Sequence, residues 1–509
     1  MDADVLVVGA GPVGLLLASE LALGGARVLV LERRSDLAAE PIKQGEMGAR
    51  SLNAPSVHAL RRRGLLPNVR NAALMWWDPN DRPTAPPSDD EPPPFAGHFA
   101  GIMLRADRID FEDPDLAGHE DGAGVIAQAD LERILGDRAR ELGVTIRTGV
   151  TVTDVRQTAD AVTAVTEDGP VSARWLVGCD GGRSVVRKQS GIAFPGEDAE
   201  SVFRLALVDM TEPEKLLPGG MHECEGGYYL LGGWEMRLRP TRITTIEPGT
   251  GIDGDRDAPM TAQELQDSIR RVCGIDTEIT AIHAATRYAD TTRQAATYRS
   301  GRVLLAGDAA HVHSPAGGQG LNLGISDAMN LGWKLAAVIK GEAEESLLDT
   351  YTEERHPIGA WVQDWTKAQA AITRRDPRTK ALRAVLTDLL DTKAGTTYVL
   401  KKIAGVALRY GLPGGHPLTG KLVPSRLATD DAATDGRFVL ATNDPILTDL
   451  AAQWPNRITT VPQSPDGTSL LIRPDGIVCW ASEHPESAPE QWPTWLGRPT
   501  AGRLPVAAT

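Results

Sequence analysis

The sequence has few cysteines and no long apolar run. Its four cysteines, Cys179, Cys224, Cys273 and Cys479, lie far apart in 509 residues and form no C-x-x-C pair. This spacing argues against a disulfide framework, a redox dithiol and a cysteine metal site. No apolar run is long enough to span a bilayer, and the first residues lack the basic segment of a secretion signal. We therefore expect a cytoplasmic protein with reduced cysteines, no metal ion and no membrane partner.

Positive charge is also scarce. The chain has 53 Lys+Arg against 68 Asp+Glu, a formal net charge of -15. Nucleic acids and anionic membranes are recognised by basic surfaces, so we expect neither as a partner. The length is sufficient for two to four domains with a large core, and no internal repeat interrupts it. The composition therefore favours an acidic enzyme that acts on small molecules.

A dinucleotide-binding fingerprint begins the chain. The pattern predicts a strand at residues 4–8, a glycine turn, a helix to about Gly24, and a second strand that ends in Glu32. Glycines in such a turn let the backbone approach a pyrophosphate, and the acid accepts a hydrogen bond from the ribose 2′-OH, which favours FAD or NAD. Arg33 either contacts a phosphate or is solvated. The residues predicted to bind the dinucleotide here are Gly9, Gly11, Pro12, Val13, Gly14, Glu32 and Arg33.

The stretch from Gly301 to Leu335 organises the rest of the chain. It predicts a strand, a turn at Gly307 and Asp308, an extended segment with Pro315, and a helix that begins on glycines. Such a helix presents unpaired N–H groups and its positive dipole end to a ligand. A reduced flavin fits, because its pyrimidine edge is negative and its ribityl hydroxyls can donate to Asp308. The residues predicted to bind the cofactor are Gly307, Asp308, Pro315, Gly318, Gln319, Gly320, Leu321 and Asn322.

Two motifs carry a resemblance to a known family. The run GRVLLAGDAAHVHSPAGGQGLNLGISDAMNLGWKLA resembles the "GD" fingerprint of class A FAD-dependent aromatic monooxygenases, which have the para-hydroxybenzoate hydroxylase fold, and is closest to the aromatic-polyketide and phenol hydroxylase branch. The run after Cys179, Asp180-Gly181-Gly182, is similar to the family's "DG" fingerprint, whose aspartate lies between FAD and the nicotinamide route. Asp180 can equally cap the helix that follows.

The resemblance implies the cofactor, the chemistry and two further site residues. It implies FAD, with NADPH or NADH as a transient reductant, and hydroxylation of a polycyclic phenol or quinone by O2 through a flavin C4a-hydroperoxide in antibiotic biosynthesis. The flavin is the reagent, so no catalytic side chain is assigned. Lys43 stands where the family usually has an arginine near the flavin or its phosphates, and it either contacts them or is solvated. Gln128, just before a helix, corresponds to a glutamine on the flavin side.

The resemblance also implies a substrate pocket, though each of its residues has a packing alternative. An acidic, Pro-rich insertion at 78–94 is expected either to be disordered or to cover a pocket. Phe95 to Gly101 resembles the strand that borders the family's substrate cavity. The aromatic residues are candidate pocket walls or ordinary core residues. The predicted pocket residues are Trp76, Trp77, Phe95, His98, Tyr228, Trp234 and Pro315.

The expected fold class is α/β with three parts. A Rossmann-like FAD domain of the GR2 type comprises 1–72, 111–190 and 287–393, and an antiparallel-sheet middle domain comprises 73–110 and 191–286. Thr261 to Glu264 forms a capping box for a helix in the middle domain. Residues 394–509 resemble a thioredoxin-like domain without a dithiol, for which we expect a structural or dimer-facing role in a homodimer. Arg473-Pro474-Asp475-Gly476 predicts a turn between two of its strands.

Other functions remain open on the same fold. A Baeyer–Villiger reaction on a polycyclic ketone or quinone differs only in how the peroxide approaches and is protonated. Hydroxylation that inactivates an antibiotic is a further alternative. A protein of another class, a flavin-binding accessory protein that transfers no oxygen, would carry the same two fingerprints.

Overall fold

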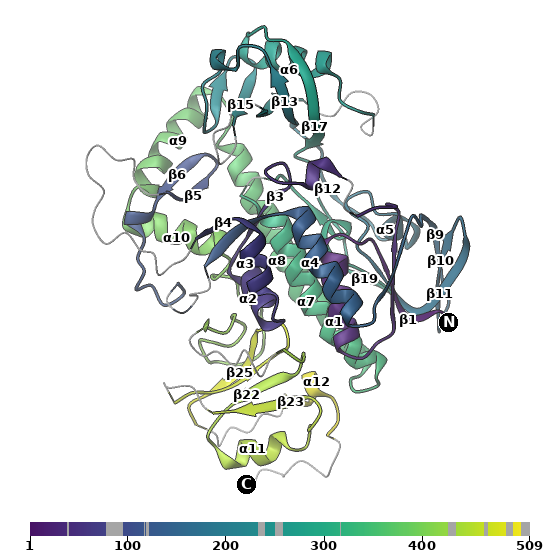
Figure 1. Ribbon diagram of the computed structural model, residues 1–509. Helices are drawn as coiled ribbons and strands as arrows, with labels where there is room; N and C mark the ends of the chain where they lie inside the picture. Colours follow the sequence, from purple (N-terminus) through teal and green to yellow (C-terminus); the bar gives the residue numbers. More distant parts are fainter. Residues whose placement is uncertain are drawn as a thin grey trace.

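The computed structural model shows a large central body flanked by two smaller sheets (Figure 1). It describes residues 1–37, 40–77, 95–116, 118, 122–232, 240–249, 258–315, 317–425, 434–462, 467–484 and 492–499. Predictions for the 78–94 insertion and for Trp234 lie outside these residues. Within the described part of the chain, no helix combines the length and the apolar character that crossing a bilayer requires.

The central sheet has eight strands, and its core strands are parallel. The parallel strands follow the order β20-β11-β1-β2-β8. β19 pairs antiparallel with β20 at one edge, and β10 and β9 continue from β11 as antiparallel strands. Every residue of β2 is buried, as expected of a parallel strand covered on both faces. The strands are β1 (Ala3–Val8), β2 (Val28–Glu32), β8 (Thr145–Thr148), β9 (Val152–Gln157), β10 (Val162–Thr166), β11 (Gly169–Gly178), β19 (Arg299–Ser300) and β20 (Val303–Leu305). The predicted N-terminal strand, turn, helix and strand are confirmed.

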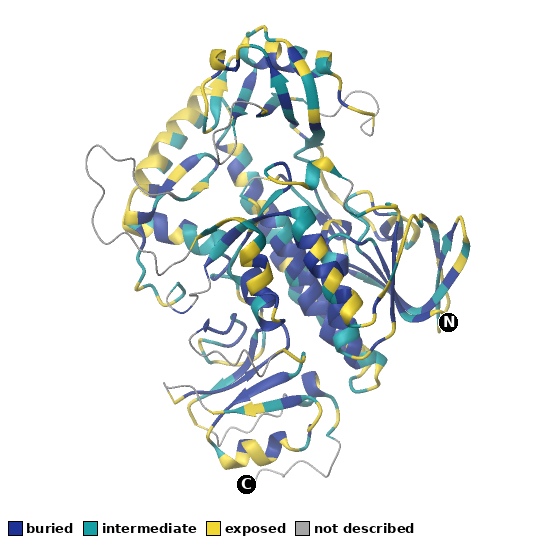
Figure 2. Ribbon diagram, in the orientation of Figure 1, coloured by how far each residue is buried: buried dark blue, intermediate teal, exposed yellow. Residues whose placement is uncertain are grey.

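Long helices bury this sheet. Figure 2 shows burial concentrated in the central strands and in α7, whereas α9 is largely exposed. In α7, most residues are buried, because the helix packs against α1 and also against the C-terminal part of the chain. The helices of the central body are α1 (Pro12–Leu23), α2 (Ala54–Arg62), α3 (Leu66–Ala72), α4 (Gln128–Glu141), α5 (Val185–Gln189), α7 (Gln319–Ile339) and α8 (Asp349–Ala371).

A five-stranded antiparallel sheet lies above the central body in Figure 1. Its order is β14-β15-β16-β13-β17, and α6 (Ala262–Cys273) covers one face. The N-cap half of the predicted capping box is confirmed, because the Thr261 side chain accepts a hydrogen bond from the Glu264 N–H at 3.1 Å. The Glu264 carboxylate pairs instead with Arg204 and Arg287. The strands are β13 (Ser201–Met210), β14 (His222–Cys224), β15 (Gly227–Leu231), β16 (Thr241–Pro248) and β17 (Ile279–Ala289).

The strands described within 73–110 belong to other sheets than that one. Its first strand, β4 (Ala73–Trp77), pairs with β7 (Ala123–Ala127), which also pairs with β3 (Ala49–Leu52). The hairpin of β5 (Phe95–Phe99) and β6 (Ile102–Arg105) packs against α9 (Pro377–Leu390) and α10 (Lys393–Ile403), since their apolar side chains form one cluster. The expected domain boundary at residue 394 therefore falls inside a helix that packs on this hairpin.

The C-terminal part contains a four-stranded sheet around a tryptophan-rich core. The order is β23-β22-β24-β25, with β22 and β23 parallel and the other pairs antiparallel. Trp454, Trp480 and Trp492 pack with Phe438 in its core. The predicted turn at residues 473–476 joins β24 to β25, which confirms it. The elements are β22 (Phe438–Ala441), α11 (Pro445–Ala451), β23 (Ile458–Val461), β24 (Ser469–Ile472), β25 (Val478–Ser482) and α12 (Trp492–Leu496).

Candidate cofactor site

The turn between β1 and α1 is closely packed on one side and open on the other. A Cβ added at Gly9 would stand 2.4 Å from the Cys179 carbonyl oxygen, and one at Gly14 would stand 2.0 Å from the Gly9 oxygen. A Cβ at Gly11 would meet nothing within 4 Å. Gly11 is the N-cap of α1 and supplies no side-chain cap, so the first N–H groups of the helix face this open side. The corner has the form of a phosphate site.

Glu32, at the end of β2, closes this corner. Its carboxylate accepts hydrogen bonds from the Ala10 N–H at 2.6 Å and from the Arg34 N–H and Nε at 3.0 and 2.9 Å. Burial acts to raise the pKa of Glu32, but the bonds from Arg34 and Ala10 outweigh it and lower the pKa. Glu32 is therefore an ionised acceptor, and a carboxylate has lone pairs left for a ribose hydroxyl. Arg33 is exposed, and its neighbour Arg34, which was not predicted, makes the contacts.

Glu132 joins two of the predicted residues. Its carboxylate pairs with Lys43 Nζ at 3.1 Å and Arg34 Nη1 at 3.3 Å, and it accepts from Gln128 Nε2 at 2.9 Å. Lys43 also pairs with Glu40 at 3.0 Å. Lys43 is thus neither free nor simply solvated. Glu132 was missed by sequence reasoning, although its place one turn after Gln128 on α4 was a usable signal.

The turn after β20 exposes one carboxylate. Asp308 is exposed, while Gly307 before it and Ala309 after it are buried. Gly307 has φ +64°, and a Cβ there would lie 3.1 Å from a methyl group of Val13 on α1. This close approach brings the two predicted corners together. Asp308 makes no hydrogen bond or ion pair with the described residues, so its carboxylate can accept bonds from a ligand.

The first turn of α7 is uncapped. Its N-cap, Gly318, has φ +63° and supplies no side-chain bond to the helix. A Cβ at Gly318 would collide with Ser51 Oγ at 2.3 Å, so β3 lies directly against this helix end. Gly318 and Pro315 are exposed, Gly320 and Leu321 are half-buried, and Gln319 is buried with its side chain bonded to the Gly317 oxygen. The N–H groups of this 21-residue helix therefore remain available.

The side chain of Asn322 is fully used in hydrogen bonds within the protein. Its Oδ1 accepts from the Asn53 N–H at 3.0 Å and from Ser56 Oγ at 2.7 Å, and its Nδ2 donates to the Ser51 and Gly318 oxygens. Because both ends of the amide are used, we assign this side chain to joining β3 and α2 to α7. Only its backbone remains as a predicted cofactor contact.

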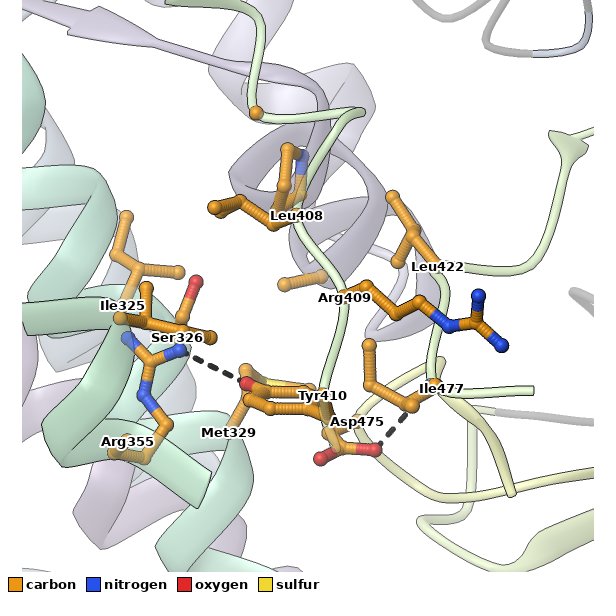
Figure 3. Close-up of a pocket in the computed structure, with 15 residues that line it drawn as sticks. Ile325, Ser326, Met329, Arg355, Leu408, Arg409, Tyr410, Leu422, Asp475 and Ile477 are labelled. Atoms are coloured by element: carbon orange, nitrogen blue, oxygen red, sulfur yellow. Dashed lines mark hydrogen bonds between the residues drawn. The ribbon is translucent and has the colours of Figure 1, made fainter. Parts of the chain in front are cut away.

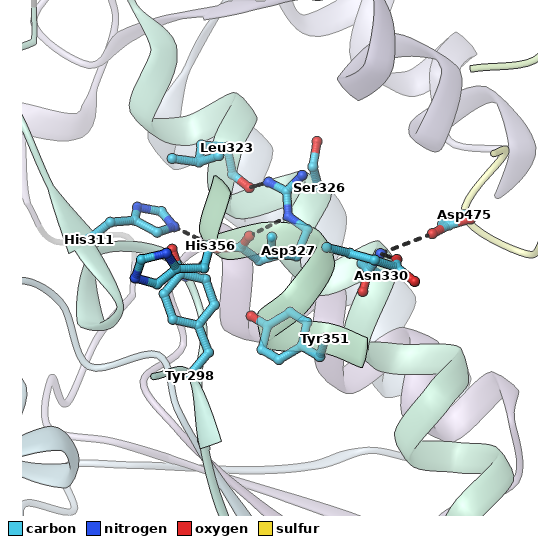
Figure 4. Close-up of polar contacts among 12 residues, drawn as sticks. Tyr298, His311, Leu323, Ser326, Asp327, Asn330, Tyr351, His356 and Asp475 are labelled. Carbon is cyan, nitrogen blue, oxygen red and sulfur yellow. Dashed lines mark hydrogen bonds and ion pairs between the residues drawn. The ribbon is translucent and has the colours of Figure 1, made fainter. Parts of the chain in front are cut away.

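A buried network around Asp327 holds the Gly307 turn, and Figure 4 shows His311 and Asp327 within it. Asp327, on α7, is fully buried and accepts from the Gly307 N–H at 3.0 Å, and it pairs with His311 and Arg355, each at 2.7 Å. Burial acts to raise the pKa of Asp327, but Arg355 and His311 lower it. Arg355 continues to the Tyr410 hydroxyl at 2.9 Å. Asp327 was not predicted, and an acid inside an otherwise buried helix is the signal that identifies it.

The DG motif packs against the same turn. Asp180 accepts from the Val185 and Val186 N–H groups at 2.7 and 3.1 Å, so the predicted cap of α5 is confirmed. Burial raises the pKa of Asp180. From α5, Arg187 donates to the Gly182 oxygen at 2.8 Å and to the Ala309 oxygen at 2.7 Å. The two fingerprints are thus physically linked through one arginine.

The residues predicted for a substrate pocket do not gather in one place. Trp76 packs on the central core with Gly124 against its ring, and Trp77 is 40% exposed. His98 is exposed on the β5–β6 hairpin, which also carries Phe95, whose side chain lies outside the described atoms. Tyr228 donates its hydroxyl to the Thr373 oxygen. Of the two alternatives for Trp76, pocket wall or core residue, its packing on the central core favours the second. A place for Trp77 in a pocket wall stays a prediction.

A second charged region lies where the C-terminal part meets α7 and α8. We call it the seam cluster, and it comprises Asn330, Lys334, Glu354, Arg473 and Asp475. Arg473 pairs with Glu354 at 2.9 Å and with Asp475, while Lys334 pairs with Glu354 at 3.0 Å. Asn330 donates to Glu354 at 2.7 Å and to Asp475 at 3.4 Å. Two cations therefore balance two carboxylates.

Two arginines at the end of α2 form hydrogen bonds with the backbone of the β24–β25 turn at the same seam. Arg62 donates to the Arg473 oxygen at 3.2 Å, and Arg63 donates to the Pro474 oxygen at 3.0 Å. A cavity of about 40 Å³ lies beside them, with Arg355, Tyr410 and Asp475 in its wall (Figure 3). None of the residues predicted to bind cofactor or substrate lines it. The seam is a structural junction.

The open glycine corner, the ionised Glu32, the exposed Asp308 and the uncapped α7 all suit one dinucleotide. Gly11 leaves room where a Cβ would block a pyrophosphate, and the other groups offer acceptors for hydroxyls and N–H donors for a negative ring edge. The fold and these two corners define the class: an α/β flavoprotein that binds FAD.

Comparison with known proteins gives the family. Residues 2–366 match the model of an FAD binding domain, and residues 416–499 match that of the aromatic-ring hydroxylase C-terminal region. The chain belongs to the FAD-dependent aromatic-ring hydroxylases and is a monooxygenase.

Three relatives show the range of the family. A solved structure of OxyS anhydrotetracycline hydroxylase from Streptomyces rimosus has a TM-score of 0.82 and 36% identity, covering 98% of this chain and 100% of that one. Rifampicin monooxygenase of Streptomyces venezuelae is 36% identical, over 98% of this chain and 100% of its own. Dialkyldecalin synthase of Streptomyces rugosporus is 35% identical, over 97% and 99%.

Proposed function

We propose that the enzyme hydroxylates a polycyclic phenol or quinone of the aromatic polyketide type, with NADPH or NADH as reductant. One observation carries the proposal: the exposed Asp308 closely precedes the uncapped start of α7, and the face of the five-stranded sheet that carries Leu205 packs on Met47 beside β3, the strand that touches this helix end. On that face, Phe203 and Tyr288 stack with ring centroids 4.8 Å apart, which suits a flat ring system. The names of the tetracycline and rifampicin relatives support the substrate class.

The chain's own residues would hold FAD in four places. Gly9, Gly11 and Gly14 admit the pyrophosphate to the start of α1, and Glu32 accepts from the adenosine ribose. Asp308 accepts from the ribityl hydroxyls. The N–H groups of residues 319–321 face the pyrimidine edge of the flavin and stabilise negative charge on it. When bound, FAD supplies the activation of O2 that no amino-acid side chain can provide.

The predicted domain limits and the nicotinamide site are parts of this proposal. The parallel β22–β23 pair joined through α11, with the β24–β25 hairpin, supports a thioredoxin-like C-terminal domain without a dithiol. One dinucleotide fingerprint favours firm binding of FAD and transient binding of the nicotinamide. The homodimer stays a prediction, which sedimentation of the purified protein would test.

The experiment is a flavin spectrum followed by anaerobic NADPH addition, with and without a panel of polycyclic phenols and quinones. We expect a yellow protein whose reduction accelerates with one ligand and which then incorporates an atom of isotope-labelled O2 into that ligand. A colourless protein that takes up no FAD would overturn the proposal. The position of the labelled oxygen, on a ring carbon or within a new ester, separates hydroxylation from the Baeyer–Villiger alternative.

The dialkyldecalin synthase relative gives a specific reason to keep a second function. Its name describes ring formation, and a chain of that kind would bind FAD without transferring oxygen. In that case the protein would be yellow, yet ligands would stimulate neither nicotinamide oxidation nor oxygen uptake. An antibiotic-inactivating hydroxylase would consume both, and its product would have lost antibacterial activity.

A further inference from the structure

Two of the four cysteines meet where α6 covers the five-stranded sheet. Cys224 is the last residue of β14 and Cys273 is the last residue of α6, and both are half-buried. Figure 1 shows α6 beside β15 and β13, and the helix shares one apolar cluster with this sheet. The fold therefore brings together two cysteines that their spacing in the sequence keeps apart. We call these two residues the thiol pair.

Strand register turns the Cys224 side chain toward α6. Cys224 pairs with Gly227 of β15, and directly paired residues of antiparallel strands share a face. Tyr229, two residues along β15, lies on the face toward α6, because it packs in one cluster with Leu265 and Ile269 of that helix. Cys224 packs against the same cluster. Its sulfur therefore lies on the helix side of the sheet.

The end of α6 brings Cys273 to the same place. Cys273 follows Ile269 by one helical turn, so both lie on the face that packs on the sheet. The Gly226 N–H donates to the Val272 oxygen at 3.1 Å, and a Cβ added at Gly226 would collide with the Arg271 oxygen. The turn that follows Cys224 is thus in backbone contact with the residues that precede Cys273, which leaves the two thiols as neighbours.

The two thiols also interact with each other. The Cys273 thiol has the Cys224 thiol as its hydrogen-bond partner. Burial, and after it the neighbouring Cys224 thiol, raises the pKa of Cys273 to about 12. Cys273 therefore keeps its proton at neutral pH, and since the thiolate is the reactive form, Cys224 is the member of the pair that reacts first.

We infer that Cys224 and Cys273 form a reversible disulfide in the presence of hydrogen peroxide, and that Cys224 is oxidised first. Its sulfur attacks one oxygen of the peroxide, the O–O bond breaks, and a sulfenic acid and a water molecule result. The Cys273 sulfur then forms the S–S bond with the Cys224 sulfur and displaces its hydroxyl group as a second water molecule. The two thiols lose two electrons and two protons in total, and the peroxide takes up both.

The oxidant and the position of the bond both suit this protein. Flavoprotein monooxygenases release hydrogen peroxide when O2 is reduced without transfer of oxygen to a substrate. Arg375, between α8 and α9, already holds the β14–β15 turn by donating to the Cys224 oxygen at 2.7 Å and to the Glu225 oxygen. A disulfide would tie the same turn to α6 and close a long loop, which stabilises a fold by constraining its unfolded state. Cellular thiols would reopen the bond once the peroxide is consumed.

The test treats the FAD-loaded enzyme with hydrogen peroxide and maps its peptides by mass spectrometry without reduction. We expect trypsin to release residues 216–237 linked to residues 272–287, with a combined mass lower by two hydrogen atoms than that of the separate peptides. A reducing agent should separate the two. The oxidised protein should also unfold at a higher urea concentration than the reduced protein.

Single variants assign the two roles. Cys273→Ser should lose the link and accumulate a sulfenic acid on Cys224, which dimedone labels, whereas Cys224→Ser should lose the link and leave Cys273 unlabelled. The matched control is Cys479→Ala, because the Cys479 thiol donates to the Leu471 oxygen at 3.3 Å within the C-terminal sheet. This variant should form the link as the parent enzyme does. The FAD content of each protein reports that it is folded.

Three results would overturn the inference: no linked peptide from the peroxide-treated parent enzyme, a link that contains Cys179 or Cys479 instead, or no dimedone label on Cys224 in Cys273→Ser. Peroxide is added and no substrate is present, so the outcome is separate from that of the oxygen-labelling experiment. An enzyme that forms the disulfide but transfers oxygen to no ligand would retain this inference and refute the proposed function.

Discussion

Two groups of charged residues, one near each end of α7, show that the same kinds of side chain can either hold the fold together or remain available to a ligand. In the seam cluster, the two cations and two carboxylates are buried together and form ion pairs with one another, while Lys334 Nζ makes no well-aligned hydrogen bond. Near the start of α7, Arg50 and Asp308 lack such partners among the described residues. A buried cluster of paired charges fixes one packing arrangement, whereas charged groups without a partner are available to a ligand. The presence or absence of a charged partner therefore distinguishes the residues that hold the fold from those that we expect to bind a ligand.

We expect the largest loss of stability when the Arg473 side chain is removed from the seam cluster. Arg473→Met would leave Asp475 buried without a cation and Glu354 with Lys334 alone, and breaking a buried pair in this way typically costs about 3–5 kcal/mol. We expect the midpoint of urea unfolding, followed by tryptophan fluorescence, to fall sharply. The control is Arg498→Met, whose pair with Glu344 is 3.4 Å long and exposed, and which should change stability by less than about 1 kcal/mol. Equal effects of the two variants would contradict the contrast.

Acid should weaken the seam through Glu354. Burial acts to raise the pKa of Glu354, but Arg473 and Lys334 outweigh it and lower the pKa from 4.5 to about 2. The unfolded chain then binds the proton more tightly, so this carboxylate stabilises the fold fully above pH 4.5 and progressively less toward pH 2. The loss is on the order of 3 kcal/mol. Unfolding measured across this range should be less pH-dependent in Glu354→Gln; an unaltered slope would argue against it.

Alkaline pH tests the same cluster through Lys334, and here too stability should rise with pH. Burial is the main cause that lowers the pKa of Lys334, from 10.5 to about 8. Between these values the unfolded chain holds the proton while the folded one releases it, so the contribution of Lys334 to stability rises with pH. Lys334→Met should remove that rise from the urea midpoints measured over this range. A parent protein whose Lys334-dependent stability falls there would refute the assignment.

Asp308 tests the group of charges without partners, through its effect on FAD affinity. Asp308→Ala should weaken FAD binding roughly 10- to 100-fold, the loss expected for hydrogen bonds to a charged acceptor, while the apoprotein unfolds at the same urea concentration. Asp327→Asn is the matched change, since that carboxylate is fully buried and bonded; it should destabilise the apoprotein itself. Titration of each apoprotein with FAD measures the affinity. A fully loaded Asp308→Ala enzyme would refute the role.

The smallest expected effect concerns two neighbouring glycines. Gly11→Ala places a methyl group where no protein atom lies within 4 Å, so the apoprotein should keep its stability while FAD binds several-fold more weakly. Gly14→Ala would bring its Cβ to 2.0 Å from the Gly9 oxygen and should destabilise the apoprotein before any ligand is added. Thermal unfolding with and without FAD separates the two. If Gly11→Ala binds FAD normally, the pyrophosphate does not pass there.

Local features were predictable from the sequence, and long-range partners were not. The glycine corner at Gly9, the capping box at Thr261 and the 473–476 turn each depend on residues a few positions apart, so their chemistry is visible in the sequence. Lys43 and Glu132 are 89 residues apart, and Arg62 and the Arg473 carbonyl are 411 apart. Which residues of a strand face a ligand depends on the sheet that it joins, and Trp76 and Trp77 could not be placed before β4 was seen to pair with β7.

The grip of α2 on the β24–β25 turn limits how this chain can be shortened or recombined. Arg62 and Arg63 hold backbone carbonyls, which every sequence possesses, but Glu354 and Lys334 require the side chains of Arg473 and Asp475. A C-terminal region exchanged from a relative would dock only if it brought an arginine and an acid at the same turn positions. Removing the region would instead expose Trp333 and the buried charges of Lys334 and Glu354 to solvent. A chimaera must therefore retain an arginine and an acid at positions 473 and 475.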